Sequence, residues 1–375
     1  MMSDSRKKLT QTKRWVVKLG SALLTNEGCG LRVDSLNTWV KQIHELRQKG
    51  HEVVIVSSGA IAEGITRLGW KKRPHAVHDL QAAAAVGQMG LIKAWESCFQ
   101  DYQIHTAQIL LSHEVISNRE RYLNARSTLR TLLKLGVVPI VNENDTVSTE
   151  ELRFGDNDTL AGLVTHLIDA DLLVLLTDQE GLYEADPRQN PQAIFISEAE
   201  AGNTSLEKYA GEGGALGRGG MLTKLKAASM AAKSGASTVI ASGLVEDVLK
   251  QIAEGEDRGT LLFSNQEALT ARKQWLAGQS QTNGVLKIDQ GAVDVLSQKG
   301  KSLLAVGVVE IEGDFKRGEC VSCVDPQGKE IARGLVNYNA AETRKIMGQA
   351  SDKIEGLLGY VDSAELIHRD DLILL

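Results

Sequence analysis

Proline and cysteine are scarce in this sequence, and long apolar runs are missing. The 375 residues include only 5 prolines and 4 cysteines. So few prolines do not fit a proline-rich linker protein, and four thiols in a chain of this size indicate reduced cysteines rather than a disulfide framework. The longest apolar runs, such as 172–176, are far shorter than the ~20 residues that span a bilayer. We therefore expect a cytoplasmic protein with no membrane segment and, because residues 1–14 are polar and basic, no secretory signal.

An excess of positive charge is also missing. Lys and Arg number 42 and Asp and Glu 48, which gives a formal net charge of −6. Such a chain has no overall electrostatic attraction to nucleic acid or to anionic membranes. Glycine, by contrast, is abundant, with 36 residues. Many glycines indicate tight turns and close backbone approaches, which phosphate-binding α/β folds require.

Short apolar runs alternate with segments of helical periodicity over the first two thirds of the chain. Strands are expected at 15–19, 53–56, 106–111, 137–141, 172–176 and 238–241. Helices are expected at 34–49, 60–68, 80–99, 119–135, 159–168, 222–233 and 245–253. This alternation predicts an α/β fold with an open, mainly parallel sheet and helices on both faces.

The pattern changes at the polar segment 278–284, which we predict to be a linker. Beyond it lie short strand-like runs separated by glycine-containing turns, at 285–288, 302–309, 319–324 and 331–336. They predict a small, mostly β domain, either a barrel or a sandwich. We therefore expect a large α/β domain over 14–277, the linker, and a second domain over 285–365.

Polar motifs directly follow several of the predicted strands. Lys18 precedes the turn Gly20-Ser21, and Ser57-Ser58-Gly59 opens a helix. Backbone N–H groups at such turns attract anions, although each turn alone is more simply an ordinary strand-to-helix connection. After the strand ending at 141, Asn142 could donate to a carboxylate and Asp145 could hold an ammonium group. A polar loop without a ligand is an equally good interpretation of this last motif.

Two further motifs lead into helices. Segment 155–158 brings acidic residues to a helix start, where Asp158 is either an N-cap or a holder of lysines or hydrated Mg²⁺. Segment 217–224 combines glycines, a helix N-terminus and Lys224, which are the parts of a phosphate clamp. Neither the GxxxxGK[ST] loop nor the GxGxxG fingerprint is present. Two lysines and several anion-binding turns at strand ends together favour phosphoryl transfer.

Together these motifs resemble those of the glutamate 5-kinases, a branch of the amino acid kinase family. The segments that carry the resemblance are 17–21, 57–60, 123–126, 141–145, 155–158, 176–178, 219–224 and 338–339. The last part of the chain resembles a PUA domain. The resemblance implies an amino acid kinase fold and ATP- and Mg²⁺-dependent phosphorylation of the γ-carboxylate of L-glutamate, the first step of proline biosynthesis. It also implies feedback inhibition by L-proline and a homo-oligomer, either a dimer or a tetramer.

The resemblance also assigns roles to residues. Lys18 and Lys224 would stabilise the transferring phosphoryl group, and Asp158 would orient both lysines. The glutamate-binding positions would be Ser58, Asp145 and Asn157. The nucleotide-binding positions would be Lys18, Thr177, Asp178, Arg218, Gly219, Gly220, Met221, Leu222, Thr223 and Lys224. Arg218 and Leu222 stand where many relatives have a small hydroxyl residue, which puts contacts from those two side chains in doubt. No metal ligand is assigned.

The chemistry of a carboxylate acceptor agrees with these motifs. A γ-carboxylate has a pKa of about 4.3, so it is already an anion at neutral pH and needs no general base. The motif turns contain no histidine that would serve as one. The rival enzyme class is a kinase of the same fold that acts on acetylglutamate, aspartate or a nucleoside monophosphate, but an acid such as Asp145 suits a free amine.

RNA binding through the second domain is a further alternative. Lys299, Lys301, Lys316 and Arg317 could form a basic edge. Aromatic residues for base stacking are few in this region, so we expect a structural or regulatory role instead. The pair Cys320 and Cys323 lacks the further ligands of a zinc site, and their odd separation places them on opposite faces of a strand. The pair His75 and His78 is expected to lie in a solvated basic loop.

Overall fold

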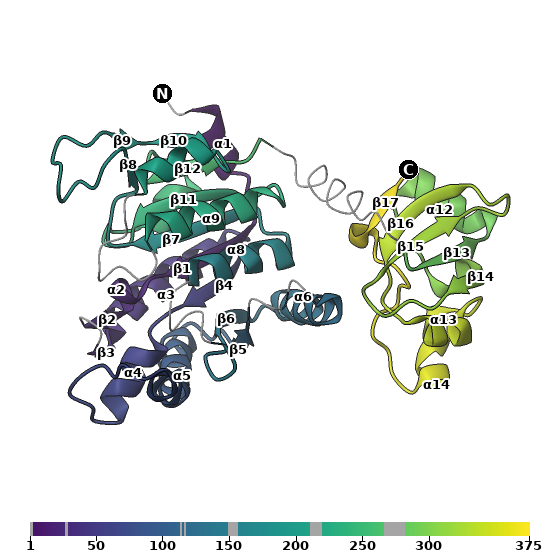
Figure 1. The fold of residues 1–375 in the computed structure, drawn as a ribbon, viewed down its shortest axis with the longest axis horizontal. Helices are drawn as coiled ribbons and strands as arrows, with labels where there is room; N and C mark the ends of the chain where they lie inside the picture. Colours follow the sequence, from purple (N-terminus) through teal and green to yellow (C-terminus); the bar gives the residue numbers. More distant parts are fainter. Residues whose placement is uncertain are drawn as a thin grey trace. The chain divides into compact units, whose positions relative to one another are not determined.

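The computed structural model describes residues 3–26, 29–112, 115, 118–148, 157–210, 220–265 and 282–375. Two compact units share the chain, the first being Met1–Glu114 with Arg126–Ala268 and the second Val115–Ala125 with Leu269–Leu375. An eight-stranded sheet forms the centre of the first unit, and a five-stranded sheet forms the centre of the second (Figure 1). None of the helices in the described ranges is long and apolar enough to span a membrane.

The sheet of the first unit has the strand order β10-β12-β11-β7-β1-β4-β6-β5. Its strands are β1 (Arg14–Leu19), β4 (Glu52–Ser57), β5 (Thr106–Leu111), β6 (Val138–Glu143), β7 (Leu172–Thr177), β10 (Glu198–Glu200), β11 (Ser237–Ser242) and β12 (Thr260–Phe263). All neighbours run parallel except β11 and β12. The central strands are buried on both faces, which is why they occur in the sequence as unbroken apolar runs. The prediction of an open, mainly parallel sheet is confirmed.

Helices cover both faces of this sheet. On one face, α3 (Val33–Gln48), α5 (Val77–Gln100) and α10 (Val248–Ala253) share a core with alternate residues of the central strands. On the other face lie α8 (Asn157–Ile168) and α9 (Met221–Ala232), which contact β1, β7 and β11. The other helices described in the first unit are α1 (Asp4–Leu9), α2 (Ser21–Leu24) and α4 (Ala60–Arg67). Helix α6 (Arg119–Lys134) begins in the segment assigned to the second unit and ends in the segment assigned to the first. Small additions are β2 (Thr25–Asn26), β3 (Cys29–Leu31), β8 (Leu182–Tyr183), β9 (Phe195–Ile196) and the 3₁₀ turn η2 (Thr204–Tyr209).

The backbones of α4 and α5 are in close contact, because Gly64 of α4 faces α5 and Gly87 of α5 faces α4. A Cβ atom on Gly64 would lie 1.7 Å from the carbonyl oxygen of Ala83. One on Gly87 would lie 1.8 Å from the carbonyl oxygen of Ala60. Since Ala60 is the first residue of α4, this contact also places the turn that precedes it, where Gly59 has a φ of 110°.

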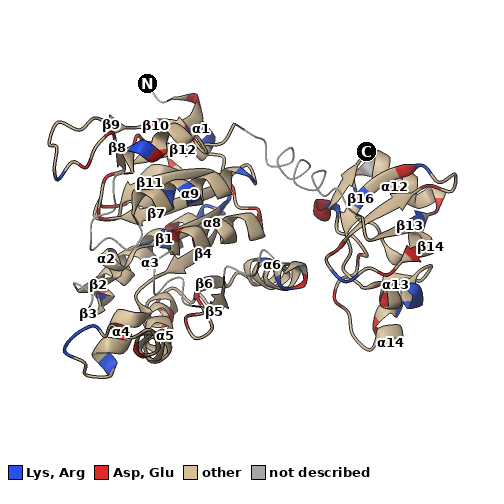
Figure 2. Cartoon of the chain, in the orientation of Figure 1, with Lys and Arg blue, Asp and Glu red and all other residues tan. Residues whose placement is uncertain are grey.

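The five-stranded sheet of the second unit has the order β14-β13-β15-β16-β17. Its strands are β13 (Gly284–Ile288), β14 (Val308–Gly313), β15 (Cys320–Val324), β16 (Glu330–Leu335) and β17 (Leu372–Leu374). The helices described in this unit are α12 (Gln290–Lys299), α13 (Ala340–Ile346) and α14 (Ile354–Leu358). The described 3₁₀ turns are η3 (Ala305–Gly307), η4 (Ser351–Lys353) and η5 (Arg369–Asp371). Acidic and basic segments are interspersed over this unit (Figure 2).

Several expectations for the second unit can be compared with the structure. The strand expected at 302–309 is wrong up to residue 307, because a 3₁₀ turn occupies 305–307 and β14 begins at Val308. Cys323 packs in the main core of the unit, whereas Cys320 packs with Leu335 and Ile373 in a separate cluster. The two thiols therefore do lie on opposite faces of β15, and neither is part of a disulfide. Most of the predicted linker, 278–281, lies outside the described residues.

Candidate active site

The polar motifs meet at one edge of the eight-stranded sheet, where the carboxyl ends of β1, β4, β6 and β7 lie together. Lys18, the fifth residue of β1, is in register with Val56 of β4 and Leu175 of β7. The amino ends of α4, α8 and α9 lie at this edge and carry polar residues that come after the strands in the sequence. Open α/β sheets bind their ligands at this edge.

A carboxylate bound to two lysines lies at the centre of the edge. Lys18 Nζ is 2.6 Å from Asp158 Oδ1, and Lys224 Nζ is 2.9 Å from Asp158 Oδ2. Both lysines are 5% exposed and Asp158 is fully buried. Three charges are thus withdrawn from water, and they sum to one positive charge. We call Lys18, Asp158 and Lys224 the charged triad.

The pKa shifts within the triad follow from this arrangement. Burial by itself raises the pKa of Asp158, but Lys18 and Lys224 outweigh it and hold that pKa far below the usual range. Burial lowers the pKa of Lys224, while the Asp158 carboxylate opposes this change. Asp158 is therefore ionised at neutral pH, and the net positive charge lies in a region of low dielectric, where it acts strongly on an anion.

The amino end of α9 lies beside the triad. Gly220 is its N-cap residue, and no side chain among the described residues caps the helix. Thr223 Oγ lies 2.7 Å from Asp158 Oδ2 and 2.7 Å from the Gly220 carbonyl oxygen, which ties this end of the helix to the triad. An uncapped helix N-terminus next to a lysine has the features of a phosphate site.

A chain of side-chain amides runs beside the triad. Asn157, the first residue of α8, donates from Nδ2 to Ser58 Oγ at 2.8 Å and to Asn142 Oδ1 at 3.0 Å. Asn142 donates from Nδ2 to Gln88 Oε1 at 2.9 Å. All four side chains are buried. We call Ser58, Asn157, Asn142 and Gln88 the amide chain.

Asp145 is a second buried carboxylate at this edge. Its side chain is 6% exposed, and its Oδ1 atom has no hydrogen-bond partner among the described residues. Burial, and then the charge of Glu143, raise the pKa of Asp145 to about 7, while Arg73 acts in the opposite direction. A carboxylate with spare lone pairs in a buried site is suited to binding a ligand cation.

The structure places most of the predicted residues at this edge. Thr177 ends β7 and donates to Asp178 Oδ1 at 3.0 Å, and Gly220, Met221 and Leu222 form the start of α9. The expected Arg218 and Gly219, together with 155–156, lie outside the described residues.

Two expectations about individual groups change. The N–H of Gly20, expected to be free, donates to the Leu176 carbonyl oxygen at 3.3 Å, because β7 adjoins β1. The amide of Asn142 is held between Gln88 and Asn157. Gln88 was not anticipated. Its only signal in the sequence is a polar residue on the buried face of an apolar helix, four residues after Ala84.

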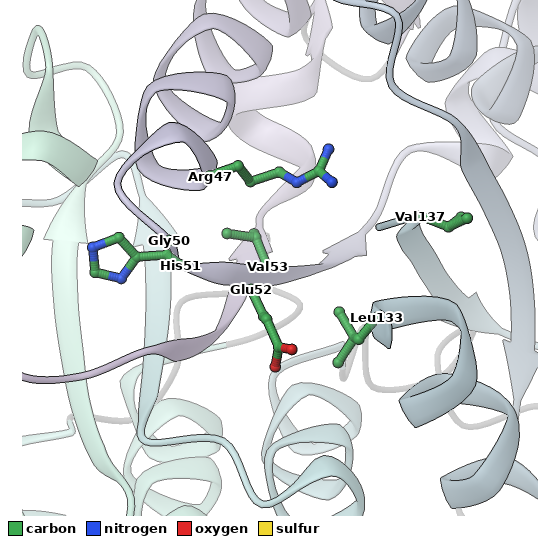
Figure 3. Close-up of a pocket in the computed structure, with 7 residues that line it drawn as sticks. All are labelled: Arg47, Gly50, His51, Glu52, Val53, Leu133 and Val137. Atoms are coloured by element: carbon green, nitrogen blue, oxygen red, sulfur yellow. The ribbon is translucent and has the colours of Figure 1, made fainter. Parts of the chain in front are cut away.

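A pocket of about 180 Å³ lies at the other end of β4, near Glu52 and Val53 (Figure 3). Its lining residues are Arg47, Gly50, His51, Glu52, Val53, Leu133 and Val137. The charged side chains there are already engaged, since Arg47 donates to the Gly136 carbonyl and Glu52 pairs with Arg14. This pocket is separate from the charged triad, because it lies at the amino end of the strand.

No group of three or more His, Cys, Asp or Glu side chains converges as a metal site within the described part of the chain. Mg²⁺ in phosphoryl-transfer enzymes usually takes only one or two carboxylates and otherwise binds water and substrate phosphates. The residues present at the sheet edge are therefore compatible with an ion that arrives with a nucleotide.

Comparison with known proteins gives a consistent result. The amino acid kinase family model matches residues 13–242, and the PUA domain model matches residues 284–358. A glutamate 5-kinase from Nitrosospira multiformis is 62% identical over 98% of this chain and 99% of its own length. A glutamate 5-kinase from Nitrosococcus oceani is 62% identical over the full length of both chains. One from Ectopseudomonas mendocina is 60% identical over 99% of this chain and all of its own. The chain therefore belongs to the amino acid kinase family, as a kinase of the glutamate 5-kinase group that also carries a PUA domain.

Proposed function

We propose that this protein transfers the γ-phosphoryl group of ATP to the γ-carboxylate of L-glutamate and forms γ-glutamyl phosphate and ADP. The observation that carries the proposal is the charged triad, which lies beside the uncapped amino end of α9. The glutamate 5-kinases that match the whole chain support the choice of substrate.

The reaction joins a carboxylate oxygen to the γ-phosphorus and breaks the bond between that phosphorus and the β–γ bridging oxygen. The carboxylate is already an anion, so the obstacle is repulsion between two negative reactants rather than removal of a proton. Lys18 and Lys224 offset this repulsion and stabilise the charge on the transferring group. Asp158 holds both ammonium groups in place before the substrates bind, so little reorganisation is needed. Mg²⁺ bound with the nucleotide would add positive charge at the β- and γ-phosphates.

The nucleotide is proposed to bind along the start of α9 and the end of β7. The proposed contacts are Lys18, Thr177, Asp178, Arg218, Gly219, Gly220, Met221, Leu222, Thr223 and Lys224. Support comes from the uncapped helix N-terminus and from Thr223, which links it to the triad.

Glutamate is proposed to bind at Ser58, Asp145 and Asn157. Asp145 would pair with its α-ammonium group, since its Oδ1 atom lacks a partner among the residues described. Acetylglutamate has no ammonium group and would leave the Oδ1 atom of this buried carboxylate without a donor, which is unfavourable. The site thus favours a free amino acid over its acetylated form.

The broader biological setting is also a proposal. We propose that the product enters proline biosynthesis, that L-proline inhibits the enzyme at or near the glutamate site, and that the protein works as a homo-oligomer in the cytoplasm. Proline also carries a charged nitrogen and a carboxylate, so Asp145 is suited to it as well. The proposed catalytic domain covers 14–277, the linker 278–284 and the PUA domain 285–365.

A substrate comparison tests the proposal. Purified protein is incubated with ATP, Mg²⁺ and hydroxylamine, and hydroxamate formation is measured with glutamate, N-acetylglutamate or aspartate as acceptor. We expect rapid hydroxamate formation with glutamate, and inhibition by proline that is relieved by more glutamate. A preference for N-acetylglutamate or aspartate would refute the assignment of the acceptor.

A further inference from the structure

We infer that Gln88 is a positioning residue for the amino acid substrate, acting through Asn142 on Asn157. The inference rests on the proposed function, because it concerns the site assigned to glutamate. Gln88 lies on α5, is 8% exposed, and makes its hydrogen bond with Asn142 rather than with any residue of the charged triad.

A side-chain amide is asymmetric, because it has one accepting oxygen and one donating nitrogen. Gln88 turns its Oε1 atom toward Asn142, so Asn142 must turn its Nδ2 atom toward Gln88 and its Oδ1 atom away. Asn157 faces that Oδ1 atom and must therefore present its own Nδ2 atom to it. The orientations of the three amides are thus coupled, from Gln88, whose Nε2 atom has no partner among the described residues, to Asn157.

The consequence appears at the far end of the chain. With its nitrogen used by Asn142 and Ser58, Asn157 keeps its Oδ1 atom buried and without a partner among the described residues. A buried acceptor of this kind is costly unless a ligand donates to it. The ammonium group of glutamate is such a donor, so we assign it to Asn157 Oδ1 as well as to Asp145 Oδ1.

Removal of Gln88 would release this orientation. Asn142 would then be able to turn over, and Asn157 would follow and present a nitrogen to the ammonium group. Two donors facing each other repel, so substrate binding would weaken. The charged triad would be unaffected, because neither lysine is bonded to the amide chain in the hydrogen bonds described.

The test is the Gln88→Met variant, in which an unbranched side chain of similar volume replaces the amide. We expect the KM for glutamate to rise about tenfold, as for one lost hydrogen bond to a charged group. The kcat and the KM for ATP should change less than about twofold, because the triad is intact. An unchanged KM for glutamate would overturn the inference.

A double-mutant cycle tests whether Gln88 acts through Asn142. Asn142→Ala alone should also raise the KM for glutamate, and adding Gln88→Met to it should raise the KM less than about twofold further. Independent, multiplying effects of the two substitutions would contradict the inference. Gln88→Glu keeps an accepting oxygen toward Asn142, so its KM for glutamate should stay near that of the wild type. A tenfold rise in that variant would count against the inference even if Gln88→Met did not fold.

Gln42 provides the matched control. It is a second buried glutamine, 2% exposed, whose Oε1 atom accepts one hydrogen bond from the Leu249 N–H at 3.0 Å. Gln42→Met should lower the melting temperature without changing the KM for glutamate, and an equal rise in KM would show that the effect of Gln88→Met is only structural. The activity of the wild type distinguishes a failure of the proposed function from a failure of the role assigned to Gln88. If the wild type does not phosphorylate glutamate, the proposed function fails, whereas an active wild type with an unaffected Gln88→Met variant refutes only the role of Gln88.

Discussion

Replacement of Asp158 by asparagine is the most informative perturbation of stability. The amide has nearly the same shape, but it removes the one negative charge that lies between Lys18 and Lys224. Removing one partner of a buried ion pair costs about 3–5 kcal/mol. Here one carboxylate serves two buried lysines, so we expect a loss near the upper limit, about 5 kcal/mol. For a domain of this size, that corresponds to a melting temperature lower by about 10–20 °C.

Thermal denaturation at neutral pH, with and without ATP, measures this effect. ATP is proposed to bind the native state and would supply negative charge to the lysines, so it should raise the melting temperature of the variant more than that of the wild type. Asp101→Asn removes the same charge at an exposed position and should leave the melting temperature unchanged. An Asp158→Asn variant that melts within about 2 °C of the wild type would refute the view that one carboxylate holds both lysines.

The pH dependence of the same difference has a definite sign. The pKa of Asp158 is depressed in the folded protein, so its contribution is present above the unfolded-state pKa and is lost as the pH falls. The stability difference between wild type and Asp158→Asn should therefore be constant from about pH 8 to 5 and shrink below about pH 4. A difference that instead vanishes near neutral pH would contradict this assignment.

Four further predictions concern other parts of the first unit. Because the pKa of Asp145 is raised to about 7, kcat/KM for glutamate should rise from about pH 6 to 8 as the carboxylate ionises; a flat profile would contradict this. Ionisation also costs stability over that range, so Asp145→Asn should be the more stable protein at about pH 8 by chemical denaturation, and a less stable variant would refute the cost. Arg6, 2% exposed, donates to four backbone carbonyls; Arg6→Met should lower the free energy of unfolding by about 3–5 kcal/mol, and a change below about 1 would count against its role. Gly87→Ala would push Ala60 and the Ser58 turn away from α5, so the KM for glutamate should rise more than the KM for ATP; equal changes would argue against a local effect.

The parallel sheet and its polar edge could be predicted from the sequence for a physical reason. Strands buried on both faces require unbroken apolar runs, and such runs mark β4 and β7 within one or two residues. Parallel strands end at the same edge, so motifs that follow different strands meet in space. Lys18 and Asp158 are 140 positions apart in the numbering of the sequence, yet this rule brings them together.

The second unit was harder to predict, since its elements are short. Helix α14 has only five residues, too few to show a helical period, and η3 interrupts a run that has the composition of a strand. Helix α13 does carry a local signal, the capping box of Asn339 and Glu342, which could have located its start.

The role of Gln88 could not be predicted from the sequence, for a different reason. Its neighbours Asn142 and Asn157 lie 54 and 69 positions further along the chain, on β6 and α8. Nothing in the local sequence of α5 shows which buried polar group its glutamine will meet. That contact follows from how closely α4 and α5 pack and where β6 ends, which only the folded structure defines.

The central claim is that the charged triad performs the phosphoryl transfer, and Lys224→Ala tests it most directly. Lys226 lies on the same helix with an exposed side chain, so Lys226→Ala is the matched control. Steady-state kinetics with ATP and glutamate should show kcat lowered by orders of magnitude for Lys224→Ala, a milder change in KM, and wild-type values for Lys226→Ala. A Lys224→Ala variant that folds and keeps a near wild-type kcat would contradict the account.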